Sequence, residues 1–126
     1  MQTNPQRPGG PELSLATLES LREIGADAEE SLAEIAFKKG DLTEALQRSY
    51  CCISGSPRFR TLSHFIAGEA LHSLGDIELA ISKFGIVVDF ASEAGLRSEA
   101  KQRTDELVDE LTVARYHAEL SSNGLP

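Results

Sequence analysis

GDLTEAL at residues 40–46 recurs 35 residues later as GDIELAI at residues 75–81. In each copy the glycine can end one helix in the left-handed conformation, and the aspartate after it can cap the next helix. The alanine four residues after the aspartate, Ala45 or Ala80, is small enough to let the two helices pack closely. The segment therefore predicts two hairpins of antiparallel helices, which is the pattern of a helical repeat.

Apolar residues recur at intervals of three and four along the rest of the chain, as they do in amphipathic helices. No segment shows the alternation that is typical of a half-buried strand. Glycines interrupt the pattern at residues 25, 40, 55, 75 and 95, and we expect each of them to follow a helix. The predicted fold class is all-α, with about six helices at residues 12–24, 27–39, 42–54, 60–74, 77–94 and 97–120.

The two ends of the chain differ in composition from the part between them. Residues 1–11 contain three prolines and two glycines but no apolar run, so we expect a flexible leader. Residues 12–120 are expected to form a single helical domain, and residues 121–126 a flexible tail. No run approaches the roughly eighteen apolar residues of a transmembrane helix, so neither membrane spanning nor secretion is expected.

Residues 26–95 resemble two tetratricopeptide repeats. The first copy matches the small, apolar and turn positions of the family signature at Leu32, Ala33, Ala36, Gly40, Asp41, Ala45, Cys52 and Pro57. The second copy matches at Ala67, Gly68, Leu71, Gly75, Asp76, Ala80, Phe84 and Val87. The chain departs from the signature at Glu29, His64, Ser49 and Ser92. The resemblance implies antiparallel helical hairpins stacked as a short right-handed superhelix.

Two repeats leave apolar faces open at both ends of such an array. The helix predicted at residues 12–24 can cover the front with Leu15, Leu18, Leu21 and Ile24. The last helix carries a stripe that can cap the array or pair with a second copy, made of Ala100, Thr104, Leu107, Leu111, Ala114 and Ala118. The expected face of a homodimer consists of Leu107, Leu111 and Ala114.

The resemblance also implies a binding site, because the first helices of tetratricopeptide hairpins line a concave groove that holds a partner peptide or helix. The corresponding positions of this chain are Glu30, Glu34, Phe37, Lys38, Phe65, Glu69 and His72. Such a groove would be apolar on one side and acidic on the other, which favours a basic-apolar peptide. In the competing interpretation the two phenylalanines belong to the core and the glutamates only keep the surface soluble.

Few residues of the chain are candidates for catalysis or metal binding. His64 and His72 lie about two helical turns apart, which is too far for them to share one metal ion. The adjacent residues Cys51 and Cys52 point about 100° apart on a helix, and we expect at least one of them in the core. Phosphate-binding, dinucleotide, zinc and nucleophile motifs are all missing from the sequence. We therefore expect no enzymatic activity, no metal site and no cofactor.

The net charge of −8 disfavours nucleic acids and anionic membrane surfaces as partners. The two cysteines cannot form an ordinary disulfide framework, which indicates reduced thiols and a cytoplasmic location.

The sequence thus favours a protein–protein interaction module, an adaptor or scaffold that binds another protein in its groove. Two alternatives stay open: a homo-oligomerising structural protein, and a small acidic chaperone similar to the tetratricopeptide chaperones of bacterial secretion. A metal-binding or enzymatic role is the least favoured, because it would depend on His64, His72 and the paired cysteines alone.

Overall fold

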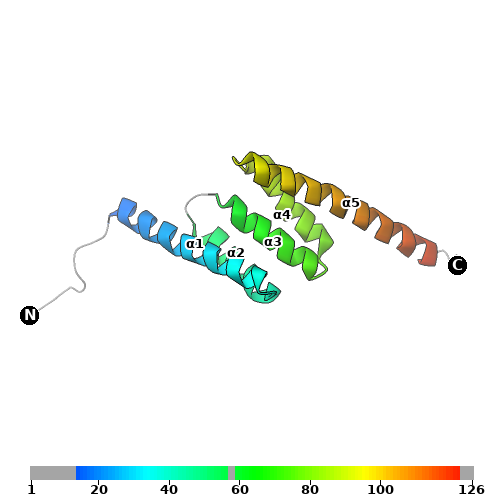
Figure 1. Ribbon diagram of the computed structural model, residues 1–126, viewed down its shortest axis with the longest axis horizontal. Helices are drawn as coiled ribbons and strands as arrows, with labels where there is room; N and C mark the ends of the chain where they lie inside the picture. The colour runs from blue at the N-terminus through cyan, green and yellow to red at the C-terminus, as the bar shows by residue number, and fades with distance from the viewer. Residues whose placement is uncertain (1–13, 57–58, 123–126) are drawn as a thin grey trace, which may run out of the picture.

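The computed structural model describes residues 14–56 and 59–122. Its helices are α1 Leu15–Lys38, α2 Leu42–Gly55, α3 Thr61–Ser73, α4 Ile77–Phe90 and α5 Ala94–Ser122 (Figure 1). The all-α prediction is confirmed, since the described ranges contain helices and no strand. The expected number of about six helices is wrong, because the first two predicted helices are one.

The sequence predicts a break at Gly25, but α1 passes through this residue as a single helix of 24 residues. A glycine inside a helix costs only about 1 kcal/mol relative to alanine. On either side of it, Glu23 and Asp27 bind the guanidinium of Arg60, which follows α2 in the chain. These contacts with a distant residue offset the cost of the glycine and keep the helix continuous.

The N-terminal half of α1 does not cover the front of the array, as the sequence predicts it should. Leu15 is 72% exposed and Ile24 is 64% exposed, and the two leucines between them are exposed as well. Because α1 continues in one direction through Gly25, this half projects beyond α2 in Figure 1. The apolar residues of the helix therefore remain uncovered.

Both predicted Gly-Asp turns are present. Gly40 has φ 84° and Gly75 has φ 94°, in the left-handed region that residues with a Cβ disfavour. The backbone N–H of the next residue, Asp41 or Asp76, donates to the carbonyl five residues back at 2.9 Å in both turns. Each aspartate carboxylate also accepts a backbone N–H three residues further on, at 3.2 Å. These local contacts end α1 and α3 and start α2 and α4.

The helices pack in chain order, so that each contacts the next, and α1 also contacts α3. In Figure 1, α1, α3 and α5 run in one direction, and α2 and α4 run in the opposite direction. One apolar cluster joins α1, α2 and α3 and contains Ala33, Ala36, Ala45, Ile66 and Ala70. A second cluster joins α3, α4 and α5 and contains Leu71, Ala80, Phe84, Val87, Ala91, Ala100 and Leu107.

The structure describes little of the two ends of the chain. The expected leader at residues 1–11 lies outside the described residues. Within the expected tail, Ser121 and Ser122 belong to α5, and residues 123–126 lie outside the described part. At its other end α5 starts at Ala94, so that Gly95 stands in its first turn and not before it. None of the described helices is long and apolar enough to cross a membrane.

Candidate partner-binding face

The side of the molecule formed by α1, α3 and α5 carries the residues that the sequence predicts for a groove. We call this side the α1–α3–α5 face. Glu30 of α1 accepts a hydrogen bond from the Ser63 hydroxyl of α3 at 2.7 Å. Its other carboxylate oxygen lies 3.4 Å from the guanidinium of Arg60, the residue just before α3. The Glu30 side chain thus points toward the neighbouring helix of the face, and only 19% of it is exposed.

Arg60 is the centre of a cluster of charges at one end of this face. Its side chain is 3% exposed and bonds to Glu23, to Glu30 and, at 2.6 Å, to Asp27. Its Nε donates to the Ser56 hydroxyl at 3.0 Å, and it also donates to the backbone carbonyl of Glu23 at 3.2 Å. Burial alone would lower the pKa of the guanidinium, but the hydrogen bonds with Asp27 and Glu23 raise it above its ordinary value.

Glu69 and Arg103 join α3 to α5 in the same way. Two parallel hydrogen bonds of 3.0 Å run from Arg103 to the Glu69 carboxylate, which is the bidentate geometry preferred by arginine. The guanidinium also lies 6.0 Å from the centre of the Phe65 ring. Burial raises the pKa of Glu69, and Arg103 opposes this rise. The guanidinium of Arg103 therefore covers one side of Phe65 while its charge is paired with the Glu69 carboxylate.

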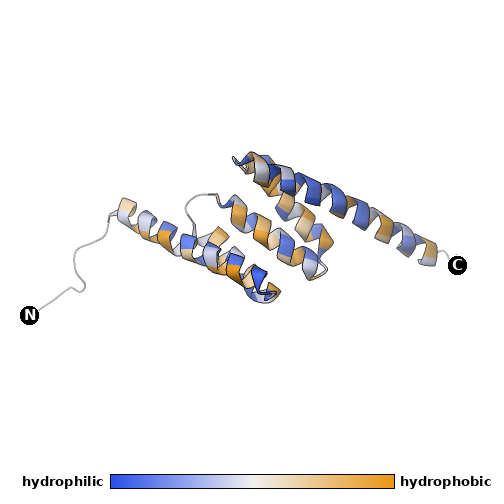
Figure 2. Ribbon diagram, in the orientation of Figure 1, coloured by the Kyte–Doolittle hydropathy of each residue, from blue (hydrophilic) through white to orange (hydrophobic). Residues whose placement is uncertain are grey.

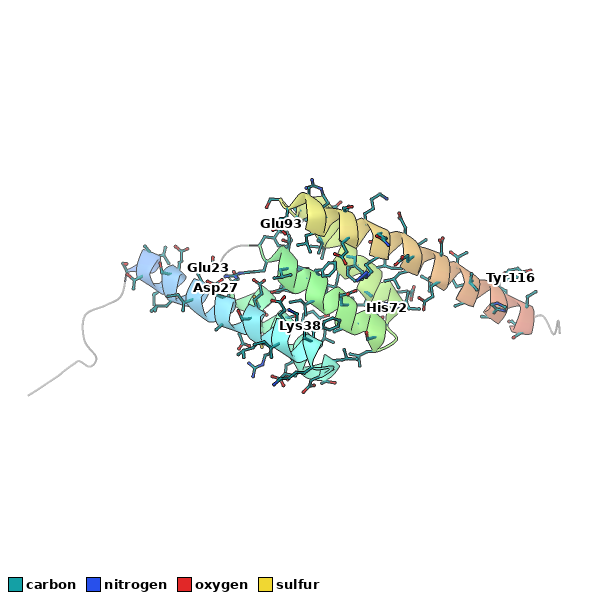
Figure 3. The ribbon with its side chains drawn as sticks, viewed as in Figure 1. Glu23, Asp27, Lys38, His72, Glu93 and Tyr116 are labelled. Atoms are coloured by element: carbon teal, nitrogen blue, oxygen red, sulfur yellow. The ribbon has the colours of Figure 1, made fainter. Side chains whose placement is uncertain are left out.

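The other predicted groove residues lie nearer the opposite end of the face. Glu34 and Lys38 form an exposed pair within α1 at 3.5 Å. His72 of α3 lies 3.4 Å from Glu110 of α5. Figure 3 shows Lys38 and His72 close to the same ends of their two helices. Phe37 is half-buried and packs against the cluster between α1, α2 and α3.

The two phenylalanines are only partly available to a partner. Phe65 stacks edge-on against the buried ring of Phe84, with 5.3 Å between the ring centres. Like Phe37, it is half-buried, so each ring serves the core on one side and meets solvent on the other. The core interpretation is therefore confirmed for one side of each ring, and partner binding by the other side stays a prediction.

The charge of the face differs from the acidic surface that the sequence predicts. Arg60 and Arg103 bring positive charge to the two most buried carboxylates of the set, Glu30 and Glu69. Sequence reasoning missed both arginines. Their spacing in the sequence could have indicated these contacts. Arg60 lies 30 residues after Glu30 and Arg103 lies 34 residues after Glu69, which is about one repeat length in each case. Residues one repeat apart lie on neighbouring helices of such an array.

The expected dimer face on α5 is not an open surface. Leu107 is 1% exposed and belongs to the core cluster between α3, α4 and α5. Leu111 is half-buried, and of the three residues only Ala114 is exposed. The stripe predicted on this helix therefore serves first to attach α5 to α4, which makes Leu107 unavailable to a second copy.

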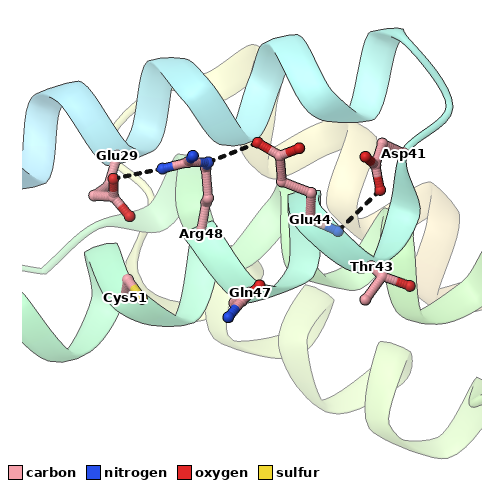
Figure 4. Close-up of a pocket in the computed structure, with 7 residues that line it drawn as sticks. All are labelled: Glu29, Asp41, Thr43, Glu44, Gln47, Arg48 and Cys51. Carbon is pink, nitrogen blue, oxygen red and sulfur yellow. Dashed lines mark hydrogen bonds and ion pairs between the residues drawn. The ribbon is translucent and has the colours of Figure 1, made fainter.

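A pocket of about 520 Å³ lies between α1 and α2 (Figure 4), away from the predicted groove residues. Arg48 within it contacts Glu29 at 2.9 Å and Glu44 at 2.8 Å. Asp41 caps α2 through the backbone N–H of Glu44. Because its charged groups bind one another, the pocket offers no uncommitted acid, base or nucleophile pair for a reaction. Its remaining lining residues are Thr43, Gln47 and Cys51.

The histidines and cysteines do not assemble into a reactive site. His64 is 5% exposed, and burial followed by the charge of Lys83 lowers its pKa to about 4. At least one cysteine was expected in the core, and Cys52 is buried whereas Cys51 is exposed. Burial raises the pKa of the Cys52 thiol, which donates to the Ala26 carbonyl at 3.3 Å. Within residues 14–56 and 59–122, no group of three metal-ligating side chains converges.

Comparison with protein-family models, with curated proteins and with solved structures shows no significant match to this chain. The features that bear on function are therefore those of the chain itself. They are a helical array, a face joined by the buried Arg60 and the half-buried Arg103, and carboxylates that mostly bind these arginines or other cations.

Proposed function

We propose that the protein is an interaction module that binds a segment of another protein on its α1–α3–α5 face and catalyses no reaction. The tetratricopeptide resemblance is part of this proposal. One observation carries it: repeat-equivalent residues of α1 and α3, such as Phe37 and His72, are collected on one face by helices that run in the same direction. Parallel helices of this kind offer a partner segment a row of similar contacts.

The partner is expected to combine apolar and basic residues. The half-exposed rings of Phe37 and Phe65 supply apolar contact area. Glu34 is the most exposed carboxylate of the predicted set, with 47% of its side chain open to solvent and only a weak pair to Lys38. The net charge of −8 favours the approach of a cationic partner at long range.

Peptide selection tests the proposal directly. Peptides selected from a random display library on the immobilised full chain are to be titrated into isotope-labelled protein, and amide shifts followed by NMR. The expected peptides are basic and apolar, and the largest shifts should fall at Phe37, Phe65, Glu69 and His72. Binding should weaken as salt concentration rises, because exposed charge pairs are screened.

A matched pair of charge reversals separates a local effect from a change in net charge. Glu34→Arg should weaken peptide binding about tenfold, which corresponds to roughly 1.4 kcal/mol. Asp105→Arg changes the net charge equally and also breaks an exposed pair within one helix, with Lys101 at 3.4 Å. It should leave the affinity within about twofold. Shifts confined to α2 and α4, or equal weakening by both variants, would contradict the proposed face.

A further inference from the structure

An apolar stripe runs along α1 on the side opposite Glu30, which meets α3, and we call it the α1 stripe. Its large side chains are 39% to 64% exposed. At about 100° per residue its members fall within an arc of roughly 120°, and no charged residue falls within that arc between the first and last of them. Figure 2 shows hydrophobic bands at intervals along the whole helix. The members are Leu18, Leu21, Ile24, Gly25, Ala28, Leu32 and Ile35.

The internal repeat shows what kind of contact this surface is shaped for. The residues of α3 that lie 35 positions after Ala28, Leu32 and Ile35 are all buried. They are covered because α2 packs on α3, as the hydrogen bond of 3.1 Å from Ser63 to Cys52 shows. No described helix precedes α1 to do the same for it. The α1 stripe is therefore the equivalent of a surface that is covered by a helix elsewhere in this chain.

We propose that a second copy of this chain covers the α1 stripe, through antiparallel and two-fold symmetric packing of α1 against α1. Apart from Ile24, which falls opposite Glu29 of the second copy, the stripe has the same order of residue sizes in both directions. About a centre between residues 26 and 27, Leu21 lies opposite Leu32 of the second copy, and Gly25 lies opposite Ala28 of the second copy. Small residues thus stand where two crossing helices come closest, and large aliphatic residues stand on either side.

The edges of the stripe fit the same arrangement. In an antiparallel pair each edge of one helix meets the same edge of the other. Arg22 and Glu29 lie on one edge, so the pairing brings Arg22 of one copy near Glu29 of the second copy. The predicted groove residues Glu30 and Phe37 lie on the opposite side of α1, so the dimer leaves the α1–α3–α5 face open. The inference therefore goes beyond the proposed function and does not depend on it.

The other end of the array argues against a head-to-tail contact. The exposed apolar residues of α5, Val108, Val113 and Tyr116, are spread over about 140° of the helix and are interrupted by Asp109 and Thr112. They do not form a stripe that matches the one on α1. In a two-fold contact, the apolar surface of α1 is covered by the identical surface of the second copy. The assembly is then complete with two copies.

The size of the stripe predicts how tightly the copies associate. Its large residues expose roughly 450 Å² per chain, so that a dimer would bury at most about 900 Å² in their contact. Stable specific interfaces bury more than about 1,200 Å². We therefore expect a reversible dimer with a dissociation constant in the micromolar range.

Sedimentation velocity of the full chain, from low micromolar to several hundred micromolar, tests the proposal. The mass should rise from that of one chain toward that of two. Leu21→Glu and Leu32→Lys, each alone, should shift the dissociation constant at least tenfold upward, because a charge then meets a leucine at two places. An equimolar mixture of the two variants should regain association, because the introduced carboxylate of one chain then meets the introduced ammonium group of the other. This rescue is specific for antiparallel pairing of these two positions.

Leu79→Glu is the matched control, since Leu79 is 39% exposed, as is Leu32, but lies on α4. It should leave the dissociation constant unchanged. Circular dichroism should show the same helix content in every variant, because all three leucines are exposed in the single chain. A mass of one chain at every concentration would overturn the proposal. So would a dimer that persists in both stripe variants, or one that Leu111→Glu disrupts in their place.

Discussion

Gly68 and Phe84 show how one residue sets the distance between two helices. Gly68 lies inside α3, where a helix former would otherwise be favoured. A Cβ at this position would lie 2.8 to 3.0 Å from atoms of the Phe84 ring of α4. The ring itself is fully buried in the cluster between α3, α4 and α5. The glycine therefore lets α4 approach α3 with a large aromatic side chain between them.

Gly68→Ala is expected to lower the free energy of unfolding by about 1–3 kcal/mol, because the ring has no room to move away. Gly85→Ala is the matched control, since Gly85 is also inside a helix but a Cβ there meets nothing within 4 Å. That variant should gain about 0.5–1 kcal/mol from helix propensity alone. Urea denaturation of both variants gives the two values, and a stabilised Gly68→Ala would contradict the close packing.

His64 is a residue whose protonation opposes folding. Its ring is buried against Phe59, with 5.2 Å between the ring centres, and its Nδ1 makes no hydrogen bond with the described residues. Its pKa is about 4 in the folded chain, below the ordinary value of 6.5. Between these two values the unfolded chain takes up a proton that the folded chain does not. The contribution of neutral His64 to the free energy of unfolding is thus complete above pH 6.5 and is lost as the pH falls to about 4.

We predict that lowering the pH from about 7 to about 4.5 destabilises the protein by up to roughly 2–3 kcal/mol more than it destabilises His64→Phe. Phenylalanine keeps an aromatic ring at this position and cannot be protonated. The measurement is urea denaturation of both proteins across this pH range. His117→Phe serves as the control because His117 is exposed, and its pH profile should follow that of the unmodified protein. Parallel profiles for the protein and His64→Phe would contradict the burial of a neutral histidine.

At the scale of the element, α1 is held in place by contacts from outside its own hairpin. The half of α1 before Gly25 projects beyond α2, so its orientation depends on the charges around Arg60. This guanidinium joins three carboxylates of α1 to the segment between α2 and α3. Figure 3 shows two of them, Glu23 and Asp27, side by side on the helix. The straightness of α1 in turn creates the α1 stripe.

Arg60→Met should lower the free energy of unfolding by about 2–3 kcal/mol, since it removes a buried cation from carboxylates that are only partly solvated. Amide hydrogen exchange should also become faster in the first half of α1 than in its second half. Arg115→Met is the control, because Arg115 pairs with Glu78 at 2.7 Å but is 65% exposed. It should change stability by less than about 0.5 kcal/mol. Equal losses in the two variants would show that the cluster does not hold the helix.

At the scale of the whole molecule, the two ends of the array are built differently. The end at α1 exposes a continuous apolar stripe, whereas α5 closes the other end with Ala100 and Leu107 buried against the core. Beyond Leu111, α5 projects past the other helices in Figure 1, and nearly all its described residues are exposed. The exposed ion pair of Arg115 with Glu78 still joins this part to α4. Stability is therefore expected to depend on the first half of α5 and hardly on the second.

A chain that ends at residue 112 should keep its free energy of unfolding within about 1 kcal/mol of the full chain, because the removed part of α5 buries little apolar area. Leu107→Ala, in contrast, should cost about 2–4 kcal/mol by leaving a cavity in the core. Thermal and urea denaturation of the two variants provide the comparison. A shortened chain as unstable as Leu107→Ala would show that the projecting half of α5 packs in solution.

The sequence by itself determined the two hairpins and that at least one of the paired cysteines is buried. The turns at Gly40-Asp41 and Gly75-Asp76 depend on a left-handed glycine and on hydrogen bonds that span at most six residues. Such interactions are complete within a short segment, so a sequence pattern is sufficient to predict them. The small residues Ala45 and Ala80 are fully buried for the same reason, since the turns fix which faces of the paired helices meet.

Only the tertiary structure decided whether Gly25 breaks a helix, which carboxylates are neutralised, and which apolar stripe is covered. Gly25 remains helical because Arg60, 35 residues later in the chain, binds both sides of it. Leu107 is buried while Leu21 is exposed, although both belong to stripes that look alike in the sequence. The physical reason is the same in each case. These outcomes depend on contacts between residues that are far apart in the sequence, and such contacts stabilise the chain only after the helices have packed.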